Sequence, residues 1–159
     1  ATERIEAFPA IYTRHWLDGF RKKIGLRTAE DGDLELIQGL LDAMQLARAD
    51  FTITFRALSN GQEPDALKDW LPLWRERLAR EETSTEERQQ LMRSVNPVYI
   101  PRNHMVEEMI RAAVDDGDYG PFEEMLRVLM APCEEQAGAE RYAAAPAETE
   151  KVYRTFCGT

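Results

Sequence analysis

The sequence has few of the residues that most often carry cross-links or chemistry. Its 159 residues include two histidines and two cysteines, and both cysteines, Cys133 and Cys157, lie near the C-terminal end. A disulfide framework of the kind that holds small secreted domains together is therefore excluded. No apolar run approaches the roughly 20 residues of a membrane-spanning helix, and no signal peptide opens the chain. We therefore expect a cytoplasmic protein without membrane contact.

Basic residues are in deficit. Twenty Lys and Arg stand against 29 Asp and Glu, which gives a net charge of −9. This charge repels phosphate backbones and anionic lipid, and no Lys/Arg cluster interleaved with aromatic residues opposes it. We therefore expect neither nucleic acid nor a membrane surface as a partner.

Signatures of nucleotide chemistry and nucleophilic catalysis are also missing. The chain has no Walker motif, no Gly-rich phosphate loop, no nucleophile elbow and no kinase catalytic loop. Carboxylate pairs such as Glu81/Glu82 and Glu134/Glu135 have the pattern of solvated charge runs, not of a buried acid–base pair. The sequence therefore predicts no catalytic and no cofactor-binding residue.

Two stretches suggest a metal site. His104, Glu107 and Glu108 would share one face of a helix, but no second histidine or cysteine stands at matching spacing. A surface histidine beside helix-start carboxylates is the favoured interpretation. Residues 115–120 resemble a calcium loop, yet Pro121 stands where the obligatory glycine belongs. We predict no metal site.

Helical periodicity runs through most of the chain and predicts about seven helices. Gly25 is expected to end the first helix, Asp33 and Asp50 to cap the second and third, and Ser84 to open a capping box. Pro72 predicts either a kink or a new helix. Inward-facing residues are expected to include Leu34, Ile37, Leu41 and Met44, and after Pro121 also Phe122, Leu126 and Leu129.

These patterns predict a single all-α domain. Residues 1–132 form its helical part, and residues 133–159, rich in Glu, Gln, Ala and Pro, form an irregular acidic tail. Tryptophans such as Trp70 and Trp74 recur at helical spacing beside other apolar residues, which favours core packing over a ligand site.

The segment NPVYIPRNH, from Asn96 to His104, carries the most information. Pro97 and Pro101 fix φ at their own positions and favour extended geometry in the residue before each of them. A stiff connector must therefore separate two helices. Asn103 is placed to cap the second helix, and Arg102 could bind a carboxylate and pin the connector to the body. Local chemistry alone favours a structural corner.

This connector and the chain end together resemble the selenoprotein O family of protein adenylyltransferases. Members carry an N-P-x-Y-[IV]-x-R-N segment, matched here by Asn96, Pro97, Tyr99, Arg102 and Asn103. The family's further segments are matched, in order, by VEEMIRAA, DDGDYGPFEEML, RVLMAPCEEQ and FCGT, and upstream by FRKKIGL and DFTITFRAL.

The resemblance implies a kinase-like (pseudokinase) fold in the parent protein, which transfers AMP from ATP to protein hydroxyls with a divalent metal such as magnesium. The nucleotide- and metal-binding residues of members precede the segments matched here. This chain would then be the C-terminal third, inactive alone, with the missing N-terminal catalytic region and the parent's protein substrates as partners. A free-standing acidic helical interaction module is the alternative, and exposed Trp70 or Trp74 would favour it.

The resemblance also gives the cysteines a meaning. Cys157 stands where some members place selenocysteine, which implies a redox role through a reversible bond to a cysteine of the catalytic region. Cys133 stands where members more usually have tyrosine. A disulfide between Cys133 and Cys157 would compete with that switch.

Overall fold

The computed structural model describes residues 2–151, with side chains from residue 7 onward, and all regular structure in this range is helical. The predicted all-α class is confirmed. Residues 1–96 and 97–159 form two compact units. None of the described helices is long and apolar enough to cross a membrane. The elements are α1 (Thr2–Lys23), α2 (Asp33–Ala47), α3 (Phe51–Ser59), η1 (Asp65–Leu67), α4 (Leu71–Leu78), α5 (Thr85–Val95), α6 (Asn103–Asp115), α7 (Gly120–Leu129), α8 (Glu140–Ala143) and η2 (Glu148–Glu150).

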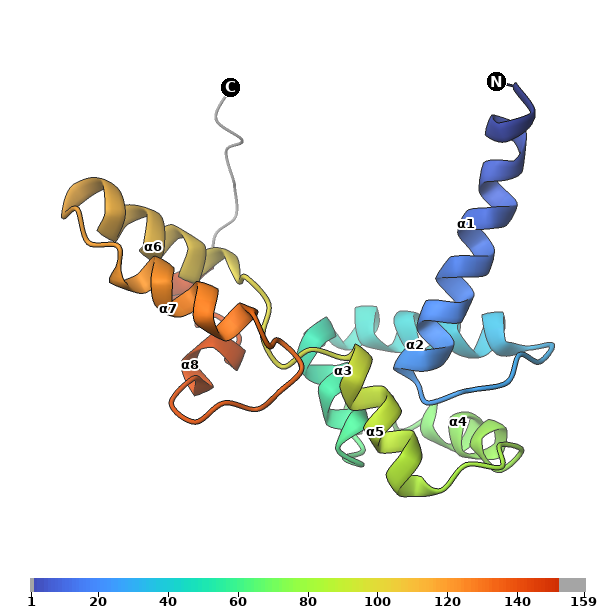
Figure 1. The fold of residues 1–159 in the computed structure, drawn as a ribbon. Helices are drawn as coiled ribbons and strands as arrows, with labels where there is room; N and C mark the ends of the chain where they lie inside the picture. The colour runs from blue at the N-terminus through green and yellow to red at the C-terminus, as the bar shows by residue number, and fades with distance from the viewer. Residues whose placement is uncertain (1, 152–159) are drawn as a thin grey trace. The chain divides into compact units, whose positions relative to one another are not determined.

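The first unit packs α1 to α5 and η1 around one apolar core (Figure 1). Helix α5 lies against α1 and α3, and α2 lies against α1 and η1. The N-terminal part of α1 extends beyond the other helices of this unit (Figure 1). The buried apolar side chains are Ile24, Leu26, Ile37, Leu40, Met44, Phe55, Leu58, Leu67, Trp70, Leu71, Trp74, Leu78 and Met92.

Several predicted helix boundaries are confirmed. Gly25 ends α1 with φ +81°. Its N–H donates to the carbonyl of Lys22, and the N–H of Leu26 donates to the carbonyl of Arg21, which is the Schellman pattern. The Asp50 carboxylate caps α3 by accepting the N–H of Ile53 at 2.9 Å. Ser84 forms the expected capping box at the start of α5. Pro72 stands in the first turn of a new helix, α4.

Trp70 and Trp74 are core residues, as predicted. Their side chains are buried and stack with ring centroids 5.4 Å apart. Each indole N–H also has a partner: Trp70 donates to the carbonyl of Leu36 and Trp74 to that of Ile24, both at 2.8 Å. A buried indole with its N–H satisfied gains its apolar burial without a desolvation penalty.

Two expectations for α2 are wrong. Asp33 does not cap the helix, because it is already the first helical residue and Gly32 stands at the cap position. Its side chain turns inward to arginines instead. Leu34 is 45% exposed, whereas Ile37 and Met44 are buried as predicted. The helix is therefore oriented so that Asp33, and not its neighbour, faces the interior.

The second unit consists of the antiparallel hairpin of α6 and α7 with α8 beside it (Figure 1). Phe122 and Leu126 were expected to face inward, but they are 46% and 51% exposed, and Met125 and Val128 are buried instead. Helix α7 is apolar over a wide arc, so its packing partner selects the buried face. The core residues are Tyr99, Met105, Met125, Val128, Ala139 and Tyr142.

The segment from Cys133 was expected to be irregular apart from one weak helical turn. It contains the short helix α8, whose Tyr142 enters the core of the second unit, and the 3₁₀ turn η2. A division of the chain at residue 132 into a helical domain and a tail stays a prediction.

Candidate functional site

Asn96, the first residue of the connector, is a buried hydrogen-bonding centre at the end of α5. Its side chain is fully buried, and its amide nitrogen donates to the carbonyl of Lys23 at 2.8 Å and to the hydroxyl of Ser59 at 2.9 Å. Its amide oxygen accepts a hydrogen bond from Lys23 Nζ at 3.1 Å. The side chain therefore joins the ends of α1, α3 and α5 within the first unit.

Two cations bind the backbone at the same helix end. Arg56 of α3 donates to the carbonyls of Arg93 and Asn96, both at 3.3 Å, and Lys23 Nζ lies 3.4 Å from the carbonyl of Val95. The last carbonyls of a helix lack intrahelical partners and carry partial negative charge. Lys23 and Arg56 therefore satisfy the end of α5 where Pro97 stops the helix.

Three of the stretches that carry the family resemblance meet at the end of α5. Lys23 belongs to FRKKIGL, Arg56 belongs to DFTITFRAL, and Asn96 opens NPVYIPRNH. They are separated by as many as 73 residues in sequence. Sequence reasoning singled out Asn96 but missed Lys23, Arg56 and Ser59 as its partners. The shared presence of these stretches in one ordered motif set was the available signal.

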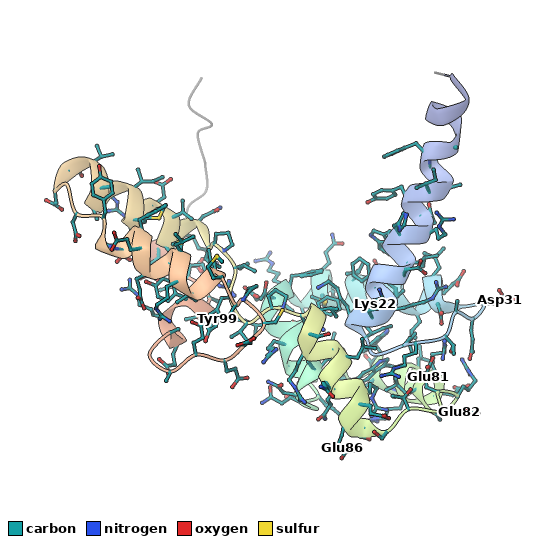
Figure 2. The ribbon with its side chains drawn as sticks, in the orientation of Figure 1. Lys22, Asp31, Glu81, Glu82, Glu86 and Tyr99 are labelled. Atoms are coloured by element: carbon teal, nitrogen blue, oxygen red, sulfur yellow. The ribbon has the colours of Figure 1, made fainter. Side chains whose placement is uncertain are left out.

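The remainder of the connector is bound into the second unit. The N–H groups of Val98 and Tyr99 both donate to the carbonyl of Pro132, at 2.8 and 3.2 Å. The hydroxyl of Tyr99, labelled in Figure 2, accepts the N–H of Gln136 at 2.9 Å, and the Tyr99 side chain is buried. Residues 98 and 99 are thereby fixed to the segment that follows α7.

Arg102 anchors the connector, whereas Asn103 does not take its predicted role. Arg102 is buried, with 7% of the residue exposed, and its guanidinium donates to the carbonyl of Ala143 at 3.3 Å. It thus ties the connector to the end of α8. Asn103 is already the first residue of α6, Arg102 holds the cap position, and no side-chain cap forms. The predicted Asn103 cap is wrong because a residue with helical backbone angles cannot cap its own helix.

A buried ion network lies elsewhere in the first unit. The Arg77 guanidinium of α4 donates from Nε to Asp33 Oδ1 at 2.8 Å and from Nη1 to Glu81 Oε1 at 2.9 Å. Its Nη2 donates to the carbonyl of Thr28 at 2.9 Å. Arg21 of α1 adds a bond from Nε to the second Asp33 oxygen at 2.7 Å. The network therefore joins α1, α2, α4 and the loop before α2.

The network sets the ionisation of its carboxylates. Burial alone would raise the pKa of Asp33, but hydrogen bonds from Arg77, the Glu30 N–H and Arg21 outweigh burial and hold that pKa below its usual value. Burial likewise acts to raise the pKa of Glu81, and bonds from the Thr28 hydroxyl, the backbone and Arg77 lower it overall. Both groups therefore stay charged at neutral pH.

The prediction that Glu81 and Glu82 are both solvated is wrong for Glu81. The Glu81 side chain is 1% exposed, whereas Glu82 is exposed (Figure 2). The available signal was Arg77, four residues earlier and near the end of α4, which can reach a carboxylate just beyond the helix. Arg77 also stands among the apolar positions Trp74 and Leu78, which place it on the buried side.

This arrangement binds the chain together and occupies the carboxylates of Asp33 and Glu81. The oxygens of Asp33 and Glu81 are taken by arginine, hydroxyl and backbone donors, so neither is placed as a general base. Glu108, considered with His104 as a metal ligand, accepts two bonds from Arg141 at 2.7 and 2.8 Å. Within residues 7–151, no three His, Cys, Asp or Glu side chains are grouped to hold a metal ion.

The two cysteines are placed to different extents. Cys133 is half-buried just after α7. Cys157 lies outside the described residues. Their pairing and the redox role of Cys157 stay predictions.

Comparisons with known proteins agree on one family. The model of the family described as protein adenylyltransferase SelO matches residues 1–130. The protein nucleotidyltransferase YdiU of Rhizobium meliloti is 47% identical, and that of Bradyrhizobium diazoefficiens 45%, each over 100% of this chain. The YdiU protein of Agrobacterium fabrum is 46% identical over 96% of the chain. The chain spans 34–35% of the length of these relatives. It therefore belongs to the SelO family of protein adenylyltransferases.

Proposed function

We propose that this chain is the C-terminal helical region of an enzyme that transfers AMP from ATP to hydroxyl groups of proteins. The observation that carries the proposal is identity of 45–47% over essentially the whole chain to proteins named nucleotidyltransferases. Because the chain spans only about a third of their length, transfer itself is assigned to the full-length protein.

The role of this region is to support the catalytic part of the enzyme. Its motif residues serve structural contacts: Asn96 joins three helix ends, and Tyr99 and Arg102 anchor the connector. The buried carboxylates Asp33 and Glu81 are held by Arg77. Side chains committed in this way hold each unit together, which is what a supporting region requires.

ATP and magnesium are assigned to the part of the full-length protein that this chain lacks. A magnesium–nucleotide site needs carboxylate oxygens open to the ion and donors open to the phosphates. The oxygens of Asp33 and Glu81 do not fit, since arginine and backbone donors already surround them. A cytoplasmic location, and protein substrates as partners, belong to the same proposal.

One feature that would favour the alternative, a free-standing interaction module, is not found in the described structure. That feature was an exposed Trp70 or Trp74, and both side chains are buried, at 4% and 6% exposed.

The test of this proposal is an assay of AMP transfer. The full-length protein and the 159-residue chain are each incubated with labelled ATP, magnesium and an acceptor protein. We expect label on the acceptor with the full-length protein and none with the chain alone. Transfer by the chain alone, or none by the full-length protein with several acceptors, would contradict it.

The redox role of Cys157 is part of the proposal and has its own test. We expect mild oxidation to change AMP transfer by the full-length protein, with Cys157→Ser abolishing that response and Cys133→Ser preserving it. A redox response that survives in Cys157→Ser would refute the switch. Loss of the response in Cys133→Ser as well would favour a Cys133–Cys157 disulfide.

A further inference from the structure

The N-terminal half of α1 has no covering neighbour in the described structure. Residues 7–15 are all exposed, whereas Trp16, Leu17 and Phe20 pack against the core of the first unit. Figure 1 shows this half of the helix extending beyond α2 to α5. One helix thus has a packed half and an uncovered half.

The uncovered half carries an apolar face. Phe8, Ile11 and Tyr12 are 63%, 46% and 58% exposed, at the three- and four-residue spacing that places them on one side of the helix. The rings of Phe8 and Tyr12 stack with centroids 6.1 Å apart. Thr13, two residues beyond Ile11, is also exposed and lies on the opposite side.

This face is continuous with the core. Trp16 follows Tyr12 by one turn, and its ring lies 4.4 Å from that of Phe20. The Phe20 ring in turn meets Phe51 and Phe55 of α3, at 6.3 and 6.0 Å. An aromatic row therefore begins in the packed core and runs out along α1 past the edge of the unit.

A half-helix of this kind needs a partner to persist in water. Helical segments shorter than about 12–15 residues are marginal by themselves, and most helix stability in proteins comes from packing an apolar face. Three large apolar side chains in a continuous row also exceed the scattered exposure that is normal for a surface. The sequence of α1 thus specifies a helix whose supporting surface lies elsewhere.

We propose that the face formed by Phe8, Ile11 and Tyr12 packs into an apolar groove on the remaining two-thirds of the full-length enzyme. The inference rests on the proposed function, because it takes the chain to be one region of such an enzyme. The relatives are about three times as long as this chain, since it spans 34–35% of them. A groove in the same polypeptide acts at high effective concentration and is favoured over a second copy.

Hydrogen exchange tests the proposal in the protein as it exists. We expect the amides of residues 10–16 to exchange at least tenfold more slowly in the full-length protein than in the 159-residue chain. In the full-length protein, the double variant Phe8→Gln/Tyr12→Gln should return them to the rate of the isolated chain. The matched control Thr13→Gln, on the opposite side of α1, should leave the protection unchanged. Unchanged exchange across α2 to α5 verifies that each variant is folded.

Three outcomes would overturn the proposal. Equal exchange in the full-length protein and the isolated chain would mean that the groove does not exist. If protection in the isolated chain grows with the concentration of that chain, the face packs against a second copy. If the isolated chain is protected at every concentration, the face packs against another part of the same chain. AMP transfer is measured on the same samples, so loss of transfer with protection intact refutes only the proposed function.

Discussion

Replacing Arg77 by methionine should destabilise the first unit strongly. The Arg77 side chain is 3% exposed and holds Asp33 and Glu81, whose side chains are each 1% exposed. Methionine keeps most of the volume but removes the charge, which leaves two buried carboxylates with fewer partners. Removal of one member of a buried pair costs about 3–5 kcal/mol. The lower end of this range applies, because Asp33 keeps its hydrogen bond from Arg21 and Glu81 keeps its hydrogen bond from the Thr28 hydroxyl.

Urea unfolding followed by tryptophan fluorescence measures this effect in the right place. All three tryptophans lie within residues 1–96, so their fluorescence reports on the first unit. A loss of about 3 kcal/mol, with a slope of about 1.5 kcal/mol per molar urea, lowers the midpoint by about 2 M. The control is Arg75→Met, on the same helix, because the pair of Arg75 with Glu63 is exposed and should matter little.

The dependence on pH gives a second measurement of the same network. The pKa values of Asp33 and Glu81 are lowered in the folded protein, so their contribution is complete at neutral pH and is lost as the pH falls below about 4. The difference between wild type and Arg77→Met should shrink over that range. A variant no less stable than Arg75→Met, or a difference that is constant down to pH 3, would refute the reasoning.

The remaining predictions concern the connector and one turn. Asn96→Ala should lower the free energy of unfolding by about 2 kcal/mol, measured by urea unfolding followed by circular dichroism, because it leaves buried partners unsatisfied. Asn103→Ala, at an exposed position without a cap, should have little effect in that assay; equal effects would contradict this. Gly25→Ala should lower the free energy of unfolding by about 1 kcal/mol more than Gly32→Ala does. Both glycines have positive φ, but a Cβ at Gly25 would lie 2.5 Å from the Arg88 side chain, whereas Gly32 has open space. Tyr99→Phe should lower the free energy of unfolding by about 1 kcal/mol, measured by thermal unfolding followed by circular dichroism. An unchanged unfolding midpoint would mean that water replaces the Tyr99 hydroxyl.

The helices that sequence reasoning predicted correctly are those whose signals are local. The capping box at Ser84 uses a bond between residues three positions apart, and Gly25 closes α1 through bonds within five residues. The spacing of Phe51, Phe55 and Leu58 likewise indicates the helix after Asp50, although the residues at 52–54 favour a strand. In α3, Phe55 and Leu58 are buried and Phe51 is 45% exposed. Such interactions are complete within one segment, so the sequence of that segment specifies them.

The faces of the helices were harder to predict. Helix α7 carries apolar residues over a wide arc, and its neighbours in the second unit select Met125 and Val128 over Phe122 and Leu126. Asp33 has the residue type of a cap, yet it is drawn inward by Arg77, which lies 44 residues away in sequence. A pattern within one helix does not contain the identity of its partner.

For this protein, the sequence by itself determined the all-helical class, the main helix boundaries, the non-helical connector between α5 and α6, and the family resemblance. Only the tertiary structure decided that Asp33, Arg77 and Glu81 form a buried network and that Lys23 and Asn96, 73 residues apart, meet at one helix end. The physical reason is the range of the interactions. Caps and prolines act on the backbone within a few residues, whereas burial of a charge depends on which distant segment supplies its counter-charge.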